Sequence, residues 1–410
     1  MRVLVLNCGS SSVKYQFIDM DGEKVLAKGL VEKIGLHNSE MSHKRHDNVT
    51  YTVEKEILDH NVAIEMVIDI LLSSEYGVIR EKSEIDAVGH RVVHGGEKFS
   101  GSVAITDDVM KTLEDCSGLA PLHNPPNIKG ILATMKLLPQ APQCCVFDTA
   151  FHQTMPDYAY TYALPQNLYR KYGVRRYGFH GTSHRYVSDR VAACMGRPYI
   201  ELKIITCHLG NGSSIAAINC GKSVDTSMGF TPVEGLVMGT RCGDIDPAIL
   251  LHVMEKEDLT IQQANNMINK HSGLYALSEG ASSDMRVIYN DGEWTRDHVH
   301  KLAMEVTAYR IRKYIGAYAA AMGGLDAVVY TAGIGENAFY LRALACSGLE
   351  FLGIKIDPEK NFKASAMGEW RGLEKAVTTD DSRVQVWVIP TNEEIVIARD
   401  TSIIVSKNKK

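Results

Sequence analysis

The sequence contains no long hydrophobic run and no excess of positive charge. No stretch approaches the ~20 apolar residues that cross a membrane, and the apolar residues around 314–325 are interrupted by Asp326. The formal net charge is −5, from 44 Lys and Arg against 49 Asp and Glu, so the chain offers no large electropositive field. We therefore expect neither a membrane nor a nucleic acid as a partner.

Paired cysteines are also missing. The nine cysteines are an odd number and include no Cys-x-x-Cys pair, which argues against a disulfide framework and a structural zinc site. The pairs His90/His94 and His180/His184 lack the His-Glu-x-x-His pattern of zinc enzymes. The apolar start Met1–Gly9 is too short for the hydrophobic region of a signal peptide. We expect it to form a buried strand, and the protein to be cytoplasmic.

The chain has 410 residues, of which 45% are hydrophobic and 23% charged, an ordinary globular composition. Because single cores stop growing near ~250–300 residues, we expect two domains. Short apolar runs predict five buried strands: Val3–Leu6, Ala87–Val93, Cys144–Phe147, Ile204–His208 and Ala327–Thr331. Apolar residues at three- and four-residue spacing predict helices at Asp59–Leu72 and His298–Met322. Strands that alternate with helices indicate an α/β fold.

Two distant segments share a pattern. Val3–Phe17 and Ile204–Ile218 each consist of an apolar run, a turn that contains Gly and Ser, and a second apolar run. This pattern predicts a strand–turn–strand unit in each half of a duplicated fold, with each unit offering a loop to a shared cleft. Since the segments have little beyond Gly-Ser-Ser in common, a chance similarity remains an alternative.

Three glycine-containing turns carry groups that can bind phosphate. Gly9–Lys14 (GSSSVK) combines backbone N–H groups, hydroxyls and an ammonium, which can form an anion-binding nest. It is not a Walker loop, because the second glycine is missing and a strand-like segment follows, so an ordinary serine-rich turn is the alternative. His208–Ser214 (HLGNGSS) and Gly333–Asn337 (GIGEN) are further glycine loops at predicted strand ends, where α/β sheets collect ligands. Together the three loops indicate a nucleotide.

Cationic residues and one carboxylate lie next to glycines or strand ends. Arg91 is near the end of a predicted strand, Arg241 lies in a loop rich in Gly and Thr, and His180 precedes a predicted helix. Asp148 follows another predicted strand. Phosphoryl transfer needs mainly positioning and positive charge around the equatorial oxygens, and two arginines, a histidine and a metal-holding carboxylate supply both. The alternative is that the arginines are solvated and the histidine is packed.

Several long and unusual segments follow one another in the order found in a known family. They are LNCGSSSVKY (6–15), GHRVVHGGEKF (89–99), APLHNPPN (120–127), FDTAFHQTMP (147–156), YGFHGTSHRYVS (177–188), HLGNGSSI (208–215), DTSMGFTPVEGLVMGTRCGDIDP (225–247), TAGIGEN (331–337) and IPTNEE (389–394). From end to end they resemble the acetokinase family of short-chain carboxylate kinases. The resemblance implies an α/β fold of two duplicated actin-like and sugar-kinase-like (ribonuclease H-like) domains around a nucleotide cleft. The N-terminal domain would comprise residues 1–150 plus 388–410, and residues 151–387 would form the nucleotide-binding and dimerisation domain of a homodimer.

The resemblance also implies a role for each matching residue. The catalytic residues would be Asp148, Arg91, His180 and Arg241, with Arg91 also gripping the substrate carboxylate. The small acyl pocket would be lined by Val93, Leu122, Phe179 and Pro232. The nucleotide would be bound by Ser10, Ser12 and Lys14, by His208, Leu209, Gly210, Asn211 and Gly212, and by Asp284, Met285, Arg286, Gly333, Ile334, Gly335, Glu336 and Asn337. Mg²⁺ or Mn²⁺ would be held by Asn7 and Glu393, although the adjacent Glu394 is an alternative ligand.

The implied reaction is the reversible, ATP-dependent phosphorylation of acetate to acetyl phosphate, with ATP and ADP as co-substrates. A carboxylate is ionised at pH 7 and needs no general base, so the site must chiefly offset the repulsion between two anions. Two arginines and Mg²⁺ would do so during a direct in-line transfer. Propionate as the acceptor, in a slightly larger pocket, is the nearest alternative. An actin-like ATPase without acyl chemistry is a distant one.

One segment departs from the pattern of the family. Residues 272–280 (SGLYALSEG) are bulkier and less rich in glycine than the resemblance leads us to expect. Tyr275 therefore either alters the nucleotide preference or repacks a loop, and repacking is the preferred interpretation.

Overall fold

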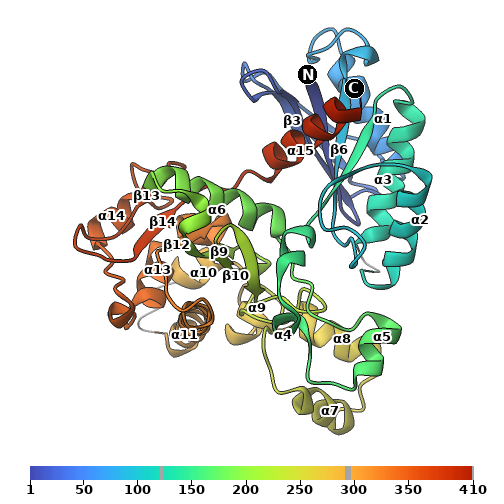
Figure 1. Ribbon diagram of the computed structural model, residues 1–410. Coiled ribbons are helices and arrows are strands. Elements are labelled where there is room, and N and C mark those ends of the chain that lie inside the picture. The colour runs from blue at the N-terminus through green and yellow to red at the C-terminus, as the bar shows by residue number, and fades with distance from the viewer. Residues whose placement is uncertain (121–122, 291–296, 409–410) are drawn as a thin grey trace. The chain divides into compact units, whose positions relative to one another are not determined.

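The computed structural model describes residues 1–120, 123–290 and 297–408 (Figure 1). The chain forms two compact units, Met1–Phe151 with Asn392–Lys410, and His152–Thr391. The later boundary was predicted at 388, whereas the structure has it at 392. The strand that ends at Val388 pairs within the sheet of the second unit, so the chain leaves that unit only after it. That each unit is an independent domain stays a prediction.

An eight-stranded mixed sheet forms the first unit, in the order β5-β4-β3-β2-β1-β6-β8-β7. Its strands are β1 (Arg2–Cys8), β2 (Ser12–Asp19), β3 (Lys24–Glu32), β4 (Glu40–Arg45), β5 (Thr50–Glu54), β6 (Ala87–Val92), β7 (Val103–Ala104) and β8 (Gln143–Phe147). β1, β2 and β3 are antiparallel neighbours, whereas β1, β6 and β8 run parallel. Residues 3–6 of β1 are all buried, as expected for a strand that is covered on both faces.

Helices cover the two faces of this sheet. They are α1 (His60–Leu72), α2 (Asp107–Asp115), α3 (Asn124–Leu137) and α15 (Glu393–Asn408). Val88 of β6 shares a hydrophobic core with α1, whereas its neighbour Gly89 faces Ile397 of α15. In Figure 1 the red helix α15 lies beside the blue strands, and it contacts β1, β6 and β8. The C-terminal helix is therefore part of the first unit.

A six-stranded mixed sheet forms the second unit, in the order β11-β10-β9-β12-β14-β13. Its strands are β9 (Lys203–Leu209), β10 (Ser213–Asn219), β11 (Lys222–Thr226), β12 (Ala327–Thr331), β13 (Lys375–Ala376) and β14 (Gln385–Val388). Its helices are α4 (Asp157–Tyr160), α5 (Gln166–Tyr172), α6 (Gly181–Met195), α7 (Pro247–Lys256), α8 (Ile261–Lys270), α9 (Gly273–Leu277), α10 (Met285–Asn290), α11 (His298–Ala321), α12 (Ala332–Asn337), α13 (Phe339–Cys346) and α14 (Pro358–Lys363). Ile311 and Ile315 of α11 share a large core with Ile205 and Val328 of the sheet. α6 packs on β9 and β12.

The two sheets share one topology. In each, three antiparallel strands form a meander and two more strands add in parallel beside the first: β3-β2-β1-β6-β8 and β11-β10-β9-β12-β14. The β1–β2 turn at residues 9–11 and the β9–β10 turn at residues 210–212 occupy equivalent places. The internal pattern in the sequence therefore reflects a duplicated fold and not a chance similarity. The predicted α/β class with two duplicated units is confirmed.

The predicted elements lie close to the observed ones. All five predicted strands are present, with ends that differ by at most two residues. Asp59 precedes α1 rather than beginning it, and its carboxylate accepts hydrogen bonds from the N–H groups of Asn61 and Val62. α11 begins at His298 as predicted and ends one residue before Met322. Apolar periodicity therefore located these elements correctly.

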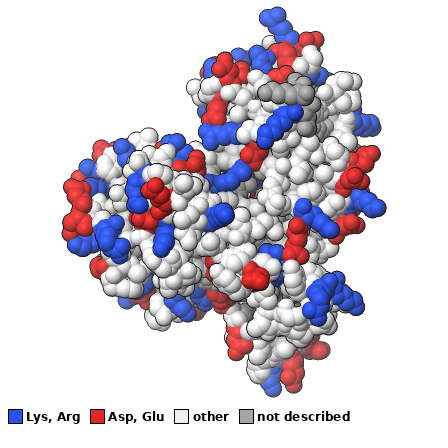
Figure 2. Space-filling view, in the orientation of Figure 1, with Lys and Arg blue, Asp and Glu red and all other residues white. Residues whose placement is uncertain are grey.

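All nine cysteines are free. Figure 2 shows Lys and Arg interspersed with Asp and Glu on the face in view. Within the described ranges, no helix is long and apolar enough to cross a membrane.

Candidate active site

Three polar side chains of the first unit meet where β1, β6 and β8 end. Asn7 and Arg91 are register partners in neighbouring parallel strands, and Asp148 follows β8 directly. Nε and Nη2 of Arg91 donate to the two carboxylate oxygens of Asp148 at 3.1 and 2.5 Å, and Nη1 donates to Asn7 Oδ1 at 3.3 Å. Asp148 is only 2% exposed. The sheet thus forms a partly buried, bidentate ion pair from residues that are distant in the sequence.

Glu393 and Glu394, in the first turn of α15, add two carboxylates to this cluster. The ammonium of Lys14 lies 2.5 Å from Oε1 of Glu394, which gives Glu394 its own counter-ion. Burial and the nearby charges of Asp148 and Glu394 raise the pKa of Glu393 to about 7, although Arg91 and Lys14 oppose the shift. Glu393 is therefore the carboxylate that a further cation would stabilise most.

A divalent cation fits this set of oxygen donors. Asn7, Asp148 and Glu393 offer the amide and carboxylate oxygens that Mg²⁺ prefers, and Mg²⁺ commonly takes only one or two carboxylates together with water and phosphate. In the described residues, no cluster of three or more His, Cys, Asp or Glu side chains is arranged to hold a metal. Because Glu394 is paired with Lys14, Glu393 is the better candidate ligand.

The predicted first phosphate loop is the turn between β1 and β2. The N–H of Gly9 donates to the carbonyl oxygen of Ser12 at 2.8 Å and closes this turn. Nε2 of His60 lies 2.7 Å from the carbonyl oxygen of Gly9, which anchors the turn to α1. Ser10 is exposed at its tip, and Lys14 follows on β2. The turn therefore lies at the same end of β1 as the Arg91 cluster.

The four residues predicted to line the acyl pocket are divided between the two units. Val93 comes two residues after Arg91 and is 8% exposed. Leu122 lies outside the described residues. Phe179 and Pro232 belong to the second unit. Neither unit contains the whole predicted pocket, so the pocket stays a prediction.

His180, Gly212 and Arg241 lie together in the second unit. A Cβ atom on Gly212 would lie 3.3 Å from Nη1 of Arg241 and 3.5 Å from Cε1 of His180, so the β9–β10 loop passes close to both side chains. His180 precedes α6 with a left-handed backbone, at φ 56°. Its ring stacks on that of His208, with centroids 4.1 Å apart. The second predicted phosphate loop therefore has two basic side chains beside it.

Arg241 is a partly buried guanidinium among neutral groups. Its Nη1 donates to the carbonyl oxygen of Pro232 at 3.3 Å and lies 3.8 Å from the sulfur of Met238. No carboxylate among the described residues forms an ion pair with it, and burial lowers the pKa of Arg241. A cation that has lost part of its hydration without gaining a counter-ion is destabilised. An anion such as a phosphoryl group would relieve this cost.

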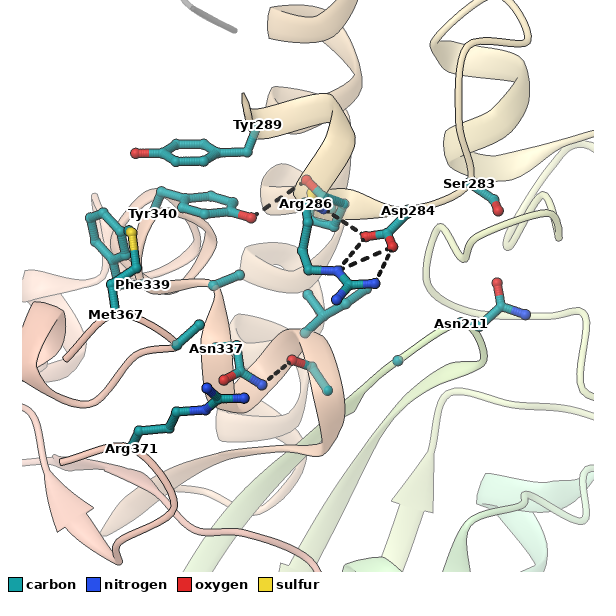
Figure 3. A pocket seen from close by; sticks show the side chains of 16 residues that line it. Asn211, Ser283, Asp284, Arg286, Tyr289, Asn337, Phe339, Tyr340, Met367 and Arg371 are labelled. Carbon is teal, nitrogen blue, oxygen red and sulfur yellow. Dashed lines mark hydrogen bonds and ion pairs between the residues drawn. The ribbon is translucent and has the colours of Figure 1, made fainter. Parts of the chain in front are cut away.

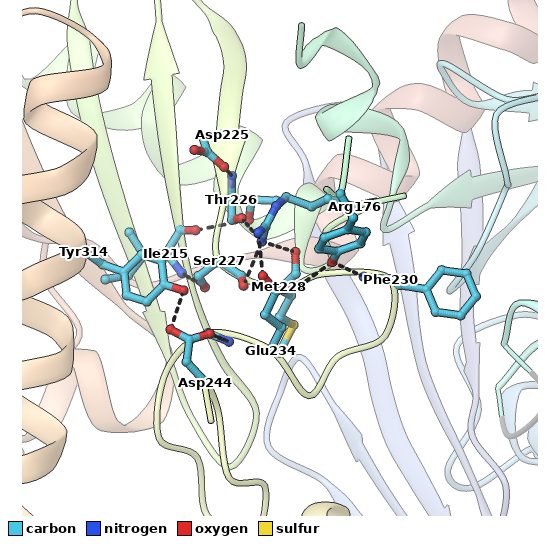
Figure 4. A network of polar contacts seen from close by, with 12 residues as sticks. Arg176, Ile215, Asp225, Thr226, Ser227, Met228, Phe230, Glu234, Asp244 and Tyr314 are labelled. Carbon is cyan, nitrogen blue, oxygen red and sulfur yellow. Dashed lines mark hydrogen bonds and ion pairs between the residues drawn. The ribbon is translucent and has the colours of Figure 1, made fainter. Parts of the chain in front are cut away.

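A network of polar contacts holds the loop that carries Pro232 and Arg241 (Figure 4). Nη1 of Arg176 donates to three successive carbonyl oxygens, those of residues 226, 227 and 228, at 2.8, 3.1 and 3.3 Å. Its Nη2 donates to Glu234 at 2.5 Å, and Glu234 also accepts from Tyr162. Nothing in the local sequence around Arg176 indicated this role, because its hydrogen-bond acceptors lie fifty or more residues further along the chain.

A pocket of about 620 Å³ lies in the second unit beside α10, α12 and α13 (Figure 3). Its lining residues are Gly210, Asn211, Ser283, Asp284, Met285, Arg286, Tyr289, Gly333, Ile334, Asn337, Ala338, Phe339, Tyr340, Ala366, Met367 and Arg371. The rings of Tyr289 and Tyr340 stack at 3.5 Å with planes 4° apart. Arg286 donates to both carboxylate oxygens of Asp284. An aromatic wall with a few polar groups is suited to a nucleoside.

The pocket contains part of the predicted nucleotide site. The predicted residues that line it are Gly210, Asn211, Asp284, Met285, Arg286, Gly333, Ile334 and Asn337, whereas His208, Leu209, Gly212, Gly335 and Glu336 do not. Sequence reasoning missed the aromatic wall, because Tyr289 and Tyr340 are distant in the sequence and stack only when α10 and α13 pack together. Tyr275 does not line the pocket either, which favours the interpretation that it repacks a loop.

The GIGEN segment was predicted to be a loop, and this was wrong, because it forms the short helix α12. Ala332 turns the chain out of β12 with a left-handed backbone, at φ 64°. Arg342 is 1% exposed and donates to the carbonyl oxygens of Gly335 and Glu336 at 2.7 and 3.0 Å. Burial lowers the pKa of Arg342 to about 10. The carbonyl groups at the end of the helix therefore have a buried partner, which the glycine pattern alone did not reveal.

Comparison with known proteins gives one consistent family. A sequence profile described as the acetokinase family matches residues 2–399. The acetate kinase of Halothermothrix orenii is 57% identical over 405 residues, which cover 99% of this chain and 100% of that protein. The acetate kinase of Thermotoga maritima is 56% identical over 407 residues, which cover 99% of each.

Solved structures agree with these similarities. The crystal structure of Porphyromonas gingivalis acetate kinase has a TM-score of 0.93 at 50% identity, and covers 98% of this chain and 99% of its own. A propionate kinase from Francisella tularensis has a TM-score of 0.89 at 41% identity with the same coverage. The similarity to both extends over nearly the whole chain.

Proposed function

The chain belongs to the acetokinase family, and from this premise we propose how its residues carry out the reaction. It is an ATP-dependent kinase whose acceptor is a carboxylate, and the reaction is the reversible phosphorylation of acetate to acetyl phosphate. ATP and ADP are the co-substrates. The observation that carries the assignment of residues is the guanidinium of Arg241, which lies beside the β9–β10 loop and has no carboxylate partner among the described residues.

Arg241 and His180 act on the phosphoryl group that is transferred. A carboxylate oxygen of acetate attacks the γ-phosphorus in line, the bond to the bridging oxygen breaks, and ADP leaves with the electron pair. The charge that spreads over the equatorial oxygens is met by the Arg241 guanidinium and by a hydrogen bond from His180. Gly212 allows the phosphate loop to lie within van der Waals distance of both side chains.

Arg91 binds the carboxylate of acetate. Asp148 accepts from its Nε and Nη2 and so holds the plane of the guanidinium in one orientation. The remaining N–H groups then offset the negative charge of the acid, which needs no general base because it is ionised at pH 7. Val93, Leu122, Phe179 and Pro232 would form the apolar wall around its methyl group.

Mg²⁺ is the metal we assign to the reaction, and Mn²⁺ fits the same donors. Asn7 and Glu393 would hold it, with Asp148 next to them. When bound, the ion would neutralise charge on the phosphate oxygens of ATP. Ser10, Ser12 and Lys14 would contact phosphate from the first loop, and His208, Leu209, Gly210, Asn211 and Gly212 from the second.

The adenosine of ATP would occupy the pocket of the second unit. Its base would lie against the stacked rings of Tyr289 and Tyr340. The neighbouring residues of the predicted site are Asp284, Met285, Arg286, Gly333, Ile334, Gly335, Glu336 and Asn337. Gly335 and Glu336 would act through the backbone of α12, because their carbonyl groups are held by Arg342.

Propionate as the principal acceptor is not favoured. The curated relatives at 55–57% identity are acetate kinases, whereas the propionate kinase from Francisella tularensis is 41% identical. An actin-like ATPase without acyl chemistry is not favoured either, because the family is one of carboxylate kinases.

A homodimer and a cytoplasmic location complete the proposal. The helices α7 and α8 leave large apolar side chains exposed, among them Leu251 at 70% and Ile261 at 82%, which a second copy would cover. Nine free cysteines and the use of ATP suit a reducing cytoplasm.

A hydroxylamine assay tests the function directly. The protein, ATP and Mg²⁺ are incubated with acetate, propionate or butyrate, and the acyl phosphate is trapped as the hydroxamate. We expect the highest kcat/KM for acetate, with propionate lower by about tenfold or more, because one methylene is worth about 1–3 kcal/mol. A higher kcat/KM for propionate would overturn the choice of substrate. The absence of any hydroxamate would overturn the carboxylate kinase itself.

A further inference from the structure

A chain of hydrogen bonds leads from His180 into the core of the second unit. Nδ1 of His180 lies 2.9 Å from the hydroxyl of Ser214, which in turn lies 2.7 Å from Nε2 of His184. Nδ1 of His184 lies 2.6 Å from the hydroxyl of Thr206. His184, Ser214 and Thr206 are each 0% exposed. These three side chains are therefore shielded from solvent.

The fold explains why these four side chains meet. His180 precedes α6, and His184 lies one helical turn later on the same face. Thr206 belongs to β9 and Ser214 to β10, which are paired strands, and α6 packs on β9 (Figure 1). The His180–His184 spacing did not match a zinc motif in the sequence. In the structure this spacing places the ring of His180 beside Gly212 and the ring of His184 between α6 and the strands β9 and β10.

The roles of donor and acceptor in these hydrogen bonds follow from Thr206, which lies at their inner end. The hydroxyl of Thr206 has no hydrogen-bond partner other than His184 among the described residues, so its proton has one available acceptor, Nδ1 of His184. Burial lowers the pKa of His184 well below its usual value, so the ring is neutral. With Nδ1 accepting, its one proton resides on Nε2, which donates to Ser214. The hydroxyl of Ser214 then donates to Nδ1 of His180.

If donors and acceptors exchanged roles, one buried donor would lack an acceptor. If His184 donated to Thr206, the hydroxyl proton of Thr206 would be buried without an acceptor. An unused lone pair is tolerated more readily than a buried donor without a partner. Each group between Thr206 and His180 has a single proton to donate. Because Thr206 donates, Nδ1 of His180 accepts.

We propose that Thr206, His184 and Ser214 are positioning residues that keep a proton on Nε2 of His180 and so present it to the transferring phosphoryl group. Nε2 lies on the side of the ring that faces Gly212, 3.6 Å from the position of an added Cβ, and Arg241 lies on the same side. A neutral imidazole in the other tautomer would direct a lone pair at phosphate oxygens and repel them. This inference rests on the proposed role of His180 in the reaction.

The kinetic test compares Ser214→Ala with Ser188→Ala. Ser214→Ala breaks the chain, and we expect kcat to fall about tenfold, with the KM values for ATP and acetate changed by less than about twofold. Ser188→Ala removes an equally buried serine of α6, whose hydroxyl lies 2.6 Å from that of Tyr199, and should leave kcat unchanged. Thr206→Ser keeps the donor at the inner end and should also retain kcat.

A double-mutant cycle separates this inference from the proposed function. In a His180→Ala background, Ser214→Ala should have no further effect on kcat. If His180→Ala itself leaves kcat unchanged, the proposed role of His180 fails. The proposed positioning role is overturned if His180→Ala lowers kcat but Ser214→Ala does not. It is also overturned if Ser214→Ala lowers kcat equally in the wild-type and His180→Ala backgrounds.

Nitrogen-15 NMR of histidine-labelled protein gives a readout that a merely structural role would not change. His180 is assigned from the signal lost in His180→Ala. We expect the wild-type ring to carry its proton on Nε2 and to have an unprotonated Nδ1, and the Ser214→Ala ring to show an altered Nδ1 signal. A proton on Nδ1 in the wild-type protein would overturn the direction of the chain, whatever the kinetics.

Discussion

Replacement of Arg241 by leucine should separate activity from stability. The guanidinium donates to a carbonyl oxygen at 3.3 Å and approaches a sulfur at 3.8 Å, and its pKa is lowered by burial. Its removal leaves no carboxylate of the described residues without its partner, so we expect the midpoint of thermal unfolding to stay nearly constant. The transition state, in contrast, loses its main cation. By analogy with other phosphoryl-transfer arginines, kcat should fall by about 10³-fold or more, equivalent to roughly 4 kcal/mol.

Arg91→Leu is the informative comparison. Asp148, which is 2% exposed, would lose the two hydrogen bonds at 3.1 and 2.5 Å and keep a buried charge. Breaking a buried pair in this way costs about 3–5 kcal/mol, so this variant should lose stability as well as activity. Both variants are measured by steady-state kinetics and thermal melts.

Arg190→Leu serves as the control for the loss of an arginine. Arg190 forms a bidentate pair with Glu374 at 2.7 and 2.6 Å, and 37% of its side chain is exposed. Its loss should leave kcat unchanged and cost at most about 1 kcal/mol. The reasoning is refuted if Arg241→Leu keeps kcat within tenfold of the wild type, or if it destabilises the protein as strongly as Arg91→Leu.

Two further predictions concern the metal cluster and the base pocket. The pKa of Glu393 is raised to about 7 from 4.5, so the native state holds a proton that the unfolded chain releases, and stability is lost as the pH rises between these values. Relative to Glu393→Gln, the free energy of unfolding of the wild type should therefore fall by about 1–3 kcal/mol between roughly pH 5 and 8. Mg²⁺ should restore this stability at the higher pH in the wild type but not in Glu393→Gln. Equal melting curves for the two proteins across this range would contradict the shift. Tyr340→Ala removes one ring of the stacked pair, so the KM for ATP should rise about tenfold with kcat nearly unchanged, and an unaltered KM in steady-state assays would argue against a base at this wall.

The strands and long helices could be predicted because their signals are local. The run Ala327–Thr331 became β12 without a change of boundary, and the period of apolar residues after His298 became α11. Burial of a strand or of one helix face depends on residues within a few positions of one another. The similar turns after β1 and β9 even indicated the duplication, since each is a short pattern repeated in the sequence.

The site was predicted only in part, for the same reason. Resemblance to a family pointed to Arg91, Asp148 and Arg241, but not to what holds them. The GIGEN segment was misjudged because its carbonyl groups are capped by the buried Arg342. The aromatic wall was missed because stacking of Tyr289 on Tyr340 requires α10 and α13 to pack against each other, and nothing in either segment specifies that.

The sequence by itself indicated the α/β class and the similarity of the two halves, and it predicted the phosphate loops and the basic residues near them. The tertiary structure decided which charges are paired: Arg91 with Asp148, Lys14 with Glu394, and Arg241 with no carboxylate in the described residues. It also decided that Ser214 links His180 to His184 by hydrogen bonds. Apolar periodicity is written in neighbouring residues, whereas hydrogen bonds and ion pairs form between strands and helices that the chain aligns only after it has folded.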